Sequence, residues 1–437
     1  MGFGGARQDG RQPLILRAGS VLCHARALGP DRMTPRTALR QNAHLAQPSP
    51  PVPTAEELIC AVLRGEHAPW RWRDEPDAAA RLFEQANAHG VCALLHSRLA
   101  SADWPPSLLQ SLRTNAIELA MWETRHQRVL AKTLAGLDAI GVRPVLVKGT
   151  ALAYSLYADA ALRTRGDTDL IIPFDAQQKV HAALLALGFE RVLAVSGEFV
   201  SYQASYVQQT SDGSSHTLDL HWKINNSELL SRLFTYDELA HDAEPLPRLC
   251  AHALGASRVH ALLLACMHRS THKQNPYYVN GEAHHDANRL IWLYDIHLLA
   301  GQLNEGEWEQ VVRLADDKGL RAVCLEGMQN AQARFHTKYP EAVLQGLAMH
   351  STPEPPALYL GGGKLRQQWM DFQALGSFTR QLRFLRELVF PSAEYMRAHY
   401  AASPSTWLSW LYIRRALGGV VKRMRARTAA EPQHADR

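Results

Sequence analysis

The fold is decided by the stretch Arg163-Thr-Arg-Gly-Asp-Thr-Asp-Leu-Ile-Ile172, near the middle of the 437-residue chain. Its second half, Thr168-Asp-Leu-Ile-Ile172, follows a polar turn and is predicted to form a strand. Side chains alternate between the two faces of a strand, so Asp167 and Asp169 project to the same side. The stretch therefore predicts two parallel carboxylates at the start of a strand.

A second strand is predicted just upstream, at Pro144-Val-Leu-Val147, followed by Lys148-Gly149 and a helix from Thr150 to Ala158. Where a strand turns into a helix, free backbone N–H groups lie at the positive end of the helix dipole. This junction suits a phosphate, with Lys148 adding charge, Gly149 allowing close approach and Thr150 offering its hydroxyl.

Two arginines lie between this helix and the carboxylates. Arg163 or Arg165 is expected to neutralise phosphate charge, although either could instead pair with an aspartate.

Downstream, residues 199–208 and 216–224 are predicted to form a β-hairpin around the loop Ser211-Asp-Gly-Ser-Ser215. Leu218, Leu220 and Trp222 share one face of its second strand, which leaves Asp219 on the other face with His221. If this strand neighbours the first, three carboxylates meet. Such an arrangement makes sense chiefly around a divalent cation, of which Mg²⁺ is the natural choice.

Outward from these motifs the pattern predicts an α+β protein with a small mixed sheet flanked by helical regions. Thr54-Ala-Glu-Glu57 has capping-box spacing and opens the helical part, which continues at 77–88 and 108–140. The expected divisions are a disordered basic leader at 1–53, a helical cap at 54–140, the α/β core at 141–226, a helical domain at 227–400 and a basic aromatic tail at 401–437.

Composition narrows the class of protein. The net charge is +5, but seven arginines between Arg7 and Arg40 and a cluster from Arg414 supply much of the excess, which gives little support to a broad nucleic-acid-binding face. The six cysteines lie far apart and contain no CxxC pair, so disulfide or zinc scaffolding is not expected. No apolar run suggests a membrane span or a signal peptide, and we expect a cytoplasmic protein.

The combination of Lys-Gly, Tyr, Arg, Asp-x-Asp-Leu and Asp-Leu-His-Trp resembles a bacterial group of uncharacterised nucleotidyltransferases, which are similar to the polymerase-beta superfamily. The resemblance covers roughly residues 55–340 and includes Trp292-Leu-Tyr-Asp-Ile-His297. Gly149-Thr150 matches that superfamily's Gly-Ser signature loosely. Thr stands in place of Ser, and sixteen residues separate Thr150 from Asp167.

This resemblance implies that Asp167, Asp169 and Asp219 bind two magnesium ions, with manganese as an alternative. It also implies transfer of a nucleoside monophosphate from a nucleoside triphosphate, ATP among the candidates, to an acceptor with release of pyrophosphate. The acceptor is left open between a small molecule, a protein and a nucleic-acid end.

Two other functions remain open at this point. The chain could be an inactive nucleotide-binding sensor or scaffold, or a membrane-associated accessory protein of surface-polymer or peptide biosynthesis. The second depends on residues 403–427, which mix aromatic, apolar and basic side chains that suit an anionic membrane surface. We expect Asp295 to cap a helix or pair with Arg289. The scattered histidines, such as His268 and His272, show no recurring metal-ligand spacing.

Overall fold

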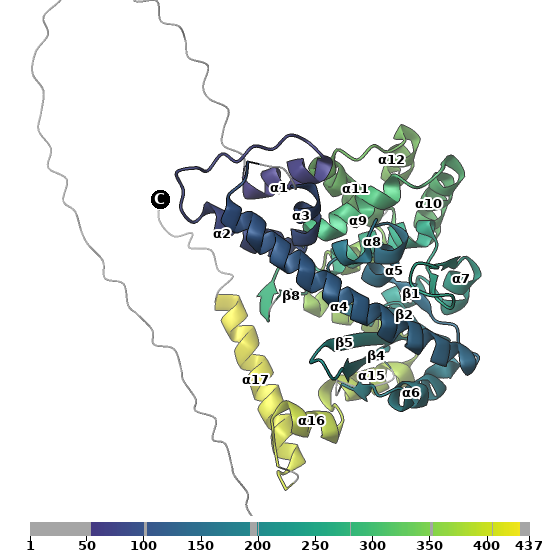
Figure 1. The fold of residues 1–437 in the computed structure, drawn as a ribbon. Helices are drawn as coiled ribbons and strands as arrows, with labels where there is room; N and C mark the ends of the chain where they lie inside the picture. The colour runs from purple at the N-terminus through teal and green to yellow at the C-terminus, as the bar shows by residue number, and fades with distance from the viewer. Residues whose placement is uncertain are drawn as a thin grey trace, which may run out of the picture. The chain divides into compact units, whose positions relative to one another are not determined.

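The computed structural model describes residues 54–99, 103–192, 199, 201–279, 281–349, 353–403 and 405–428. The leader expected at residues 1–53 lies outside these ranges. Within them, helices flank a seven-stranded mixed sheet, which confirms the predicted fold class (Figure 1).

Four described helices precede the sheet; the sequence predicted three of them and missed the short third one. They are α1 (Ala55–Arg64), α2 (Ala78–His89), α3 (Cys92–Arg98) and α4 (Pro106–Ala139). The capping box at the start of α1 is confirmed, because Thr54 accepts a hydrogen bond from the Glu57 amide while Glu57 accepts one from the Thr54 amide.

The central sheet has the strand order β3-β4-β5-β2-β1-β7-β6. Its strands are β1 (Val145–Val147), β2 (Asp167–Ile171), β3 (Glu190–Arg191), β4 (Gln203–Gln209), β5 (Ser215–His221), β6 (Glu244–Pro245) and β7 (Leu254–Gly255). β4 and β5 form the predicted hairpin, while β2 and β5 run parallel. The last two strands come from residues assigned above to the helical domain, so the sheet extends beyond residue 226.

Short helices connect these strands. They are α5 (Lys148–Ser155), the 3₁₀ turns η1 (Ala160–Leu162) and η2 (Phe174–Ala176), α6 (Gln177–Ala186), the 3₁₀ turn η3 (Leu230–Arg232) and α7 (Tyr236–His241). Asp175 lies inside the 3₁₀ turn η2, and Ala176 holds the N-cap position of α6.

The two faces of the sheet belong to two different hydrophobic cores. On one face Leu146, Leu170 and Leu218 pack beneath α4 and α6. On the other, Val145, Val147 and Ile171 join the large core formed with the helices after β7. The strands therefore lie between two hydrophobic cores, and so do the polar residues that they carry.

The helical region after β7 begins with α8 (Arg258–Thr271), the small hairpin β8 (Tyr277–Val279) and β9 (Glu282–His284), and α9 (Leu290–Ala300). It continues with α10 (Glu305–Asp317), α11 (Arg321–Phe335), α12 (Glu341–Ala348), α13 (Pro355–Leu360), α14 (Lys364–Ala374), α15 (Phe378–Val389), α16 (Ala393–His399) and α17 (Leu408–Thr428). α9 is buried along most of its length and packs against α8 and α11. No described helix is both long and apolar enough to cross a membrane.

The crossing of α8 and α11 gives a stability prediction. A Cβ on Gly327 would lie 2.8 Å from the Cys266 sulfur, in a core with no free space. We expect Gly327→Ala to lower the free energy of unfolding by about 1–3 kcal/mol, because overpacking outweighs the gain in helix propensity.

Gly306→Ala is the matched control, because Gly306 is exposed in the first turn of α10 and a Cβ there meets nothing closer than 3.6 Å. Urea denaturation should leave Gly306→Ala as stable as the parent or slightly more stable. Equal stability of the two variants would contradict the close crossing.

Candidate active site

Three of the polar side chains singled out in the sequence lie together on β2 and β5. These strands pair in parallel so that Asp169 is directly opposite Asp219 and Ile171 is opposite His221. Ligand atoms of Asp169, Asp219 and His221 lie within 4.8 Å of one another. The structure thus brings Asp219 beside Asp169, and it adds His221, for which the sequence suggested only packing or support of a ligand.

Asp167 lies at the start of β2, on the same face as Asp169 and in the same cleft. Its side chain reaches solvent through the cleft. Burial by the surrounding walls and the negative charge of Asp169 raise the pKa of Asp167 to about 7. This carboxyl therefore loses its proton at a higher pH than an ordinary aspartate does.

Lys148 reaches the carboxylates from the first position of α5. Its backbone has a φ of 56°, which is uncommon for a residue other than glycine. Its Nζ donates to Oδ1 of Asp169 at 2.6 Å, and His221 Nε2 lies 2.8 Å from the same oxygen. Although burial acts to raise it, these two neighbours hold the pKa of Asp169 below its usual value.

Gly149 and Thr150 complete the first turn of α5, where amide N–H groups have no intrahelical partner. A Cβ on Gly149 would lie 3.4 Å from Nη1 of Arg163, so the glycine relieves crowding there. The Thr150 hydroxyl is buried, contacts that of Thr168 at 2.9 Å and accepts from Nε of Arg165. It faces the protein interior, which leaves the amides as the groups of this turn that suit a phosphate.

Arg163 and Arg165 each have a buried carboxylate as partner. Arg163 forms an ion pair with Asp295 of α9 at 2.6 Å, and the hydroxyl of Tyr157 donates to the same carboxylate at 2.6 Å. Arg165 pairs with Glu123 of α4 at 2.7 Å. The expected pairing of Asp295 with Arg289 is wrong, because Arg163 takes that position across 132 residues of sequence.

A second polar cluster lies beneath β2, on the face opposite the aspartates. His126 of α4 contacts the Thr168 hydroxyl at 2.8 Å and Nδ1 of His216 at 3.1 Å. Burial lowers the pKa of His126 to about 2, so the imidazole is neutral. This cluster ties α4 to the two strands that carry the aspartates.

The aspartates face a cleft of about 720 Å³. Its opposite wall comes from α8, β8 and α9, and sequence reasoning did not assign it to the site. That wall includes His268, His272, Tyr277, Arg289 and Trp292. His272 stacks on Trp292 with ring centroids 4.4 Å apart. The only signal for this wall in the sequence was the spacing of four residues between His268 and His272, which puts both on one side of a helix.

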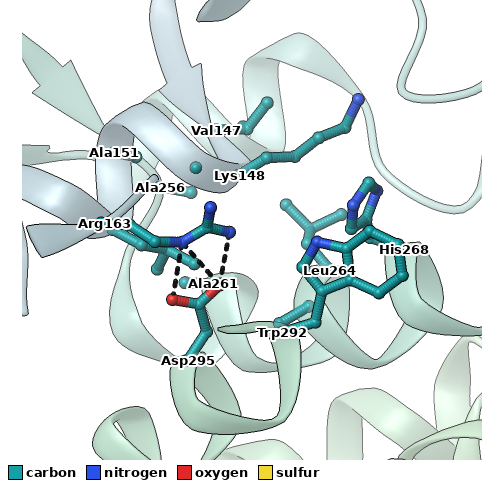
Figure 2. A pocket seen from close by; sticks show the side chains of 13 residues that line it. Val147, Lys148, Ala151, Arg163, Ala256, Ala261, Leu264, His268, Trp292 and Asp295 are labelled. Atoms are coloured by element: carbon teal, nitrogen blue, oxygen red, sulfur yellow. Dashed lines mark hydrogen bonds and ion pairs between the residues drawn. The ribbon is translucent and has the colours of Figure 1, made fainter. Parts of the chain in front are cut away.

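A small cavity of about 20 Å³ lies beside the cleft at the base of Lys148. Figure 2 shows the Arg163–Asp295 pair on one side of it and His268 and Trp292 on the other, with Lys148 extending above. Its volume suffices for a single water molecule. The cavity is thus a packing gap beside α9, and of these two spaces only the larger cleft has room for a substrate.

The residues of the cluster fit a divalent cation. The carboxylate oxygens of Asp169 and Asp219 are ligands that suit Mg²⁺ or Mn²⁺, whereas the imidazole of His221 is a ligand more typical of transition metals. Nδ1 of His221 is buried without a hydrogen-bond partner in the described residues, so its ring is held by Asp169 alone. A bound cation would neutralise the adjacent carboxylates and polarise a phosphate group.

A mixed sheet whose neighbouring strands hold carboxylates, facing a cleft beside a lysine and a helix start, is the arrangement of an enzyme acting on a nucleotide phosphate. A family model described as uncharacterised nucleotidyltransferase matches residues 75–336, more than half of the chain. The chain belongs to this family, and it is a nucleotidyltransferase. No curated protein matches the chain significantly.

The raised pKa of Asp167 gives a prediction for cation binding. Below pH 7 its carboxyl holds a proton, and that proton must leave before the oxygen can bind a cation. Magnesium affinity should therefore rise about tenfold per pH unit up to pH 7 and level off above it. Isothermal titration calorimetry between pH 5.5 and 8.5 measures this.

Asp167→Asn is the control for this titration, because an amide carries no titrating proton. The variant should bind magnesium more weakly at pH 8 and show a flatter pH profile. A parent profile that is flat from pH 5.5 to 8.5 would refute the assignment of the titration to Asp167.

Proposed function

We propose that this nucleotidyltransferase transfers a nucleoside monophosphate from a nucleoside triphosphate to a hydroxyl or similar group of an acceptor. The acceptor hydroxyl gives up its proton to water as its oxygen forms a bond to the α-phosphorus, the bond from that phosphorus to the bridging oxygen breaks, and pyrophosphate leaves. The observation that carries the proposal is the direct pairing of Asp169 with Asp219 beside Lys148. The family membership supports it independently.

The proposed metal ligands are Asp167, Asp169 and Asp219, with His221 close enough to join them. We infer two magnesium ions, for which manganese could substitute, since carboxylate oxygens suit both metals. When bound, the ions would neutralise charge on the triphosphate. Lys148 would then exchange its contact with Asp169 for one with a phosphate, because a bound cation competes for the same carboxylate oxygen.

The roles inferred for the remaining predicted residues follow from their contacts. The first-turn amides of Gly149 and Thr150 would bind phosphate oxygens. Arg163 and Arg165 would act mainly by holding the segment before β2 in place, since breaking either buried ion pair would leave a charge unpaired. Either arginine could contact a phosphate directly only through N–H groups that its ion pair does not use.

As parts of the same proposal, we assign the core to the polymerase-beta-type superfamily and the protein to a bacterial source and to the cytoplasm. The mixed sheet with acids on adjacent strands supports the first. Five described cysteines are free thiols, which is compatible with a reducing compartment. The acceptor stays open between a small molecule, a protein and a nucleic-acid end. An inactive sensor would keep the fold but would not need all three of the aspartates proposed as metal ligands.

The first test uses the purified full chain with each α-³²P-labelled nucleoside triphosphate, magnesium and host-cell extract. We expect label to move to an acceptor in the parent and to fall at least a hundredfold in Asp169→Asn, because a metal ligand is lost. Chromatography of the labelled products measures the transfer.

Asp175→Asn is the matched control, since Asp175 is exposed and outside the cleft. It should retain the parent's activity. Magnesium-dependent nucleotide binding without any transfer would favour the sensor. The absence of both binding and transfer would rule out the proposed site.

We also infer that the C-terminal helices attach the enzyme to an anionic phospholipid surface. Large apolar side chains are exposed at helical spacing on both of the long helices there. They are Phe378, Leu382, Leu385 and Val389 on α15, and Trp407, Trp410, Ile413 and Leu417 at α17, together called the C-terminal apolar surface.

Charge favours a lipid partner for this surface. Residues 364–428 contain twelve Lys and Arg but three Asp and Glu, while the whole chain has a net charge of only +5. Exposed tryptophan and phenylalanine among arginines is the composition of helices that lie in a membrane interface. Each basic side chain near such a surface contributes about 1 kcal/mol of attraction.

Flotation with vesicles tests this attachment. The full chain should float with vesicles of phosphatidylcholine and phosphatidylglycerol and remain unbound with phosphatidylcholine alone. Trp407→Ala/Trp410→Ala should lose most of the bound fraction, because it removes two interfacial anchors.

Ile117→Ala/Met121→Ala is the control, since these residues are exposed on α4 instead. It should float like the parent. Self-association by sedimentation without vesicle binding would instead assign the surface to a second copy of the chain, and would contradict the lipid proposal.

A further inference from the structure

Arg289 differs from the other arginines that line the cleft. Arg163 and Arg165 each have a carboxylate within 2.7 Å, whereas no carboxylate of the described residues forms an ion pair with Arg289. It lies at the N-cap position of α9 and faces the same cleft as the catalytic aspartates. Among the described residues, its positive charge is therefore balanced only at longer range, by Asp295 and Asp167.

Several contacts hold this guanidinium in a fixed place. Its Nε donates to the backbone oxygen of Ala88 at 2.9 Å. Its central carbon lies 4.6 Å from the ring centre of Tyr277 and 5.5 Å from that of Trp292. Gly90 makes room for it, because a Cβ there would lie 3.0 Å from Nη2. The side chain is therefore ordered before any ligand arrives.

The electrostatics of this position favour an added anion. Burial, and then the charge of Arg163, lower the pKa of Arg289 to about 10, so it remains a cation at neutral pH but an unfavourably placed one. Arg289 is partly buried, and a charge withdrawn from water without an ion-pair partner is costly unless something compensates. The planar guanidinium presents paired N–H donors that match phosphate or carboxylate oxygens.

The surrounding wall strengthens such a contact. Tyr277 and Trp292 are buried, and His272 stacks against Trp292. Aromatic rings exclude water from one side of the guanidinium, so an ion pair formed there is less screened than one at the surface. A ligand that fills the cleft would lie between this wall and the aspartates.

We propose that Arg289, with Tyr277 and Trp292, forms an anion subsite that binds a phosphate or carboxylate group of a substrate in the active-site cleft. This inference rests on the proposed transferase function and adds a substrate requirement to it. The anion belongs either to the acceptor or to the triphosphate of the nucleotide. If it belongs to the acceptor, the acceptor is an acidic compound.

Binding of base-free probes tests the subsite without any need for turnover. Orthophosphate, acetate and magnesium tripolyphosphate are titrated by calorimetry into the full chain and into Arg289→Gln. The control is Arg128→Gln, which removes the same charge from an exposed position of α4. We expect Arg289→Gln to weaken at least one probe by roughly tenfold or more, while Arg128→Gln binds like the parent.

The pattern across probes identifies the source of the anion. Loss of orthophosphate or acetate binding with unchanged tripolyphosphate binding assigns Arg289 to the acceptor. Loss of tripolyphosphate binding assigns it to the nucleotide. Affinities equal to those of Arg128→Gln for all three probes would overturn the subsite, whether or not the enzyme transfers nucleotides.

A second variant tests the position of the guanidinium, at a glycine whose φ of 71° also disfavours a side chain. Gly90→Ala keeps the guanidinium but places a methyl group against Nη2. It should weaken the same probe as Arg289→Gln, with thermal unfolding confirming that the chain remains folded. Unchanged probe binding in a folded Gly90→Ala together with unchanged binding in Arg289→Gln would exclude the subsite.

Discussion

The parallel pairing of β2 with β5 is the constraint on which the rest of this site depends. It sets Asp169 directly beside Asp219, and every side chain on the two strands takes its face from that register. A slip of one residue would turn Asp219 into the core beneath α4 and turn Leu218 or Leu220 into the cleft. The leucines that pack against α4 therefore hold the face that carries the aspartates in place by burying the opposite one.

Polar contacts beneath and beside these strands reinforce the same register. Thr168, between the two aspartates, points to the other face and contacts His126 of α4. Arg165 and Arg163 extend from the segment before β2 to Glu123 and Asp295, which belong to helices on different sides of the core. Removal of either acid would leave a buried guanidinium unpaired, so these pairs specify position even where their net contribution to stability is small.

The charges around the cleft are not distributed evenly. On the sheet side, Lys148 is drawn into the carboxylate cluster and its charge is largely compensated by Asp169. On the helical side, Arg289 has aromatic neighbours and no ion-pair partner within the described residues. A substrate with anionic groups at both ends would meet a cation at each wall, with the acids and any bound metal between them. The cleft thus has two distinct halves, built by different parts of the chain.

Much of the local structure follows from the sequence alone. The capping box at Thr54, the hairpin around Ser211–Ser215 and the alternation that puts Asp167 and Asp169 on one face depend on neighbours within a few residues, and each of these features has the predicted form. The sequence also indicated that Asp219 shares a face with His221. Only the tertiary structure decided which residues far apart in the sequence pair, namely Asp295 with Arg163 and Glu123 with Arg165. It also decided the inward direction of the Thr150 hydroxyl, the strands β6 and β7, and the aromatic wall with Arg289. The physical reason is that backbone periodicity acts over a few residues, whereas the choice of partner for a buried charge depends on which helices the hydrophobic core brings together.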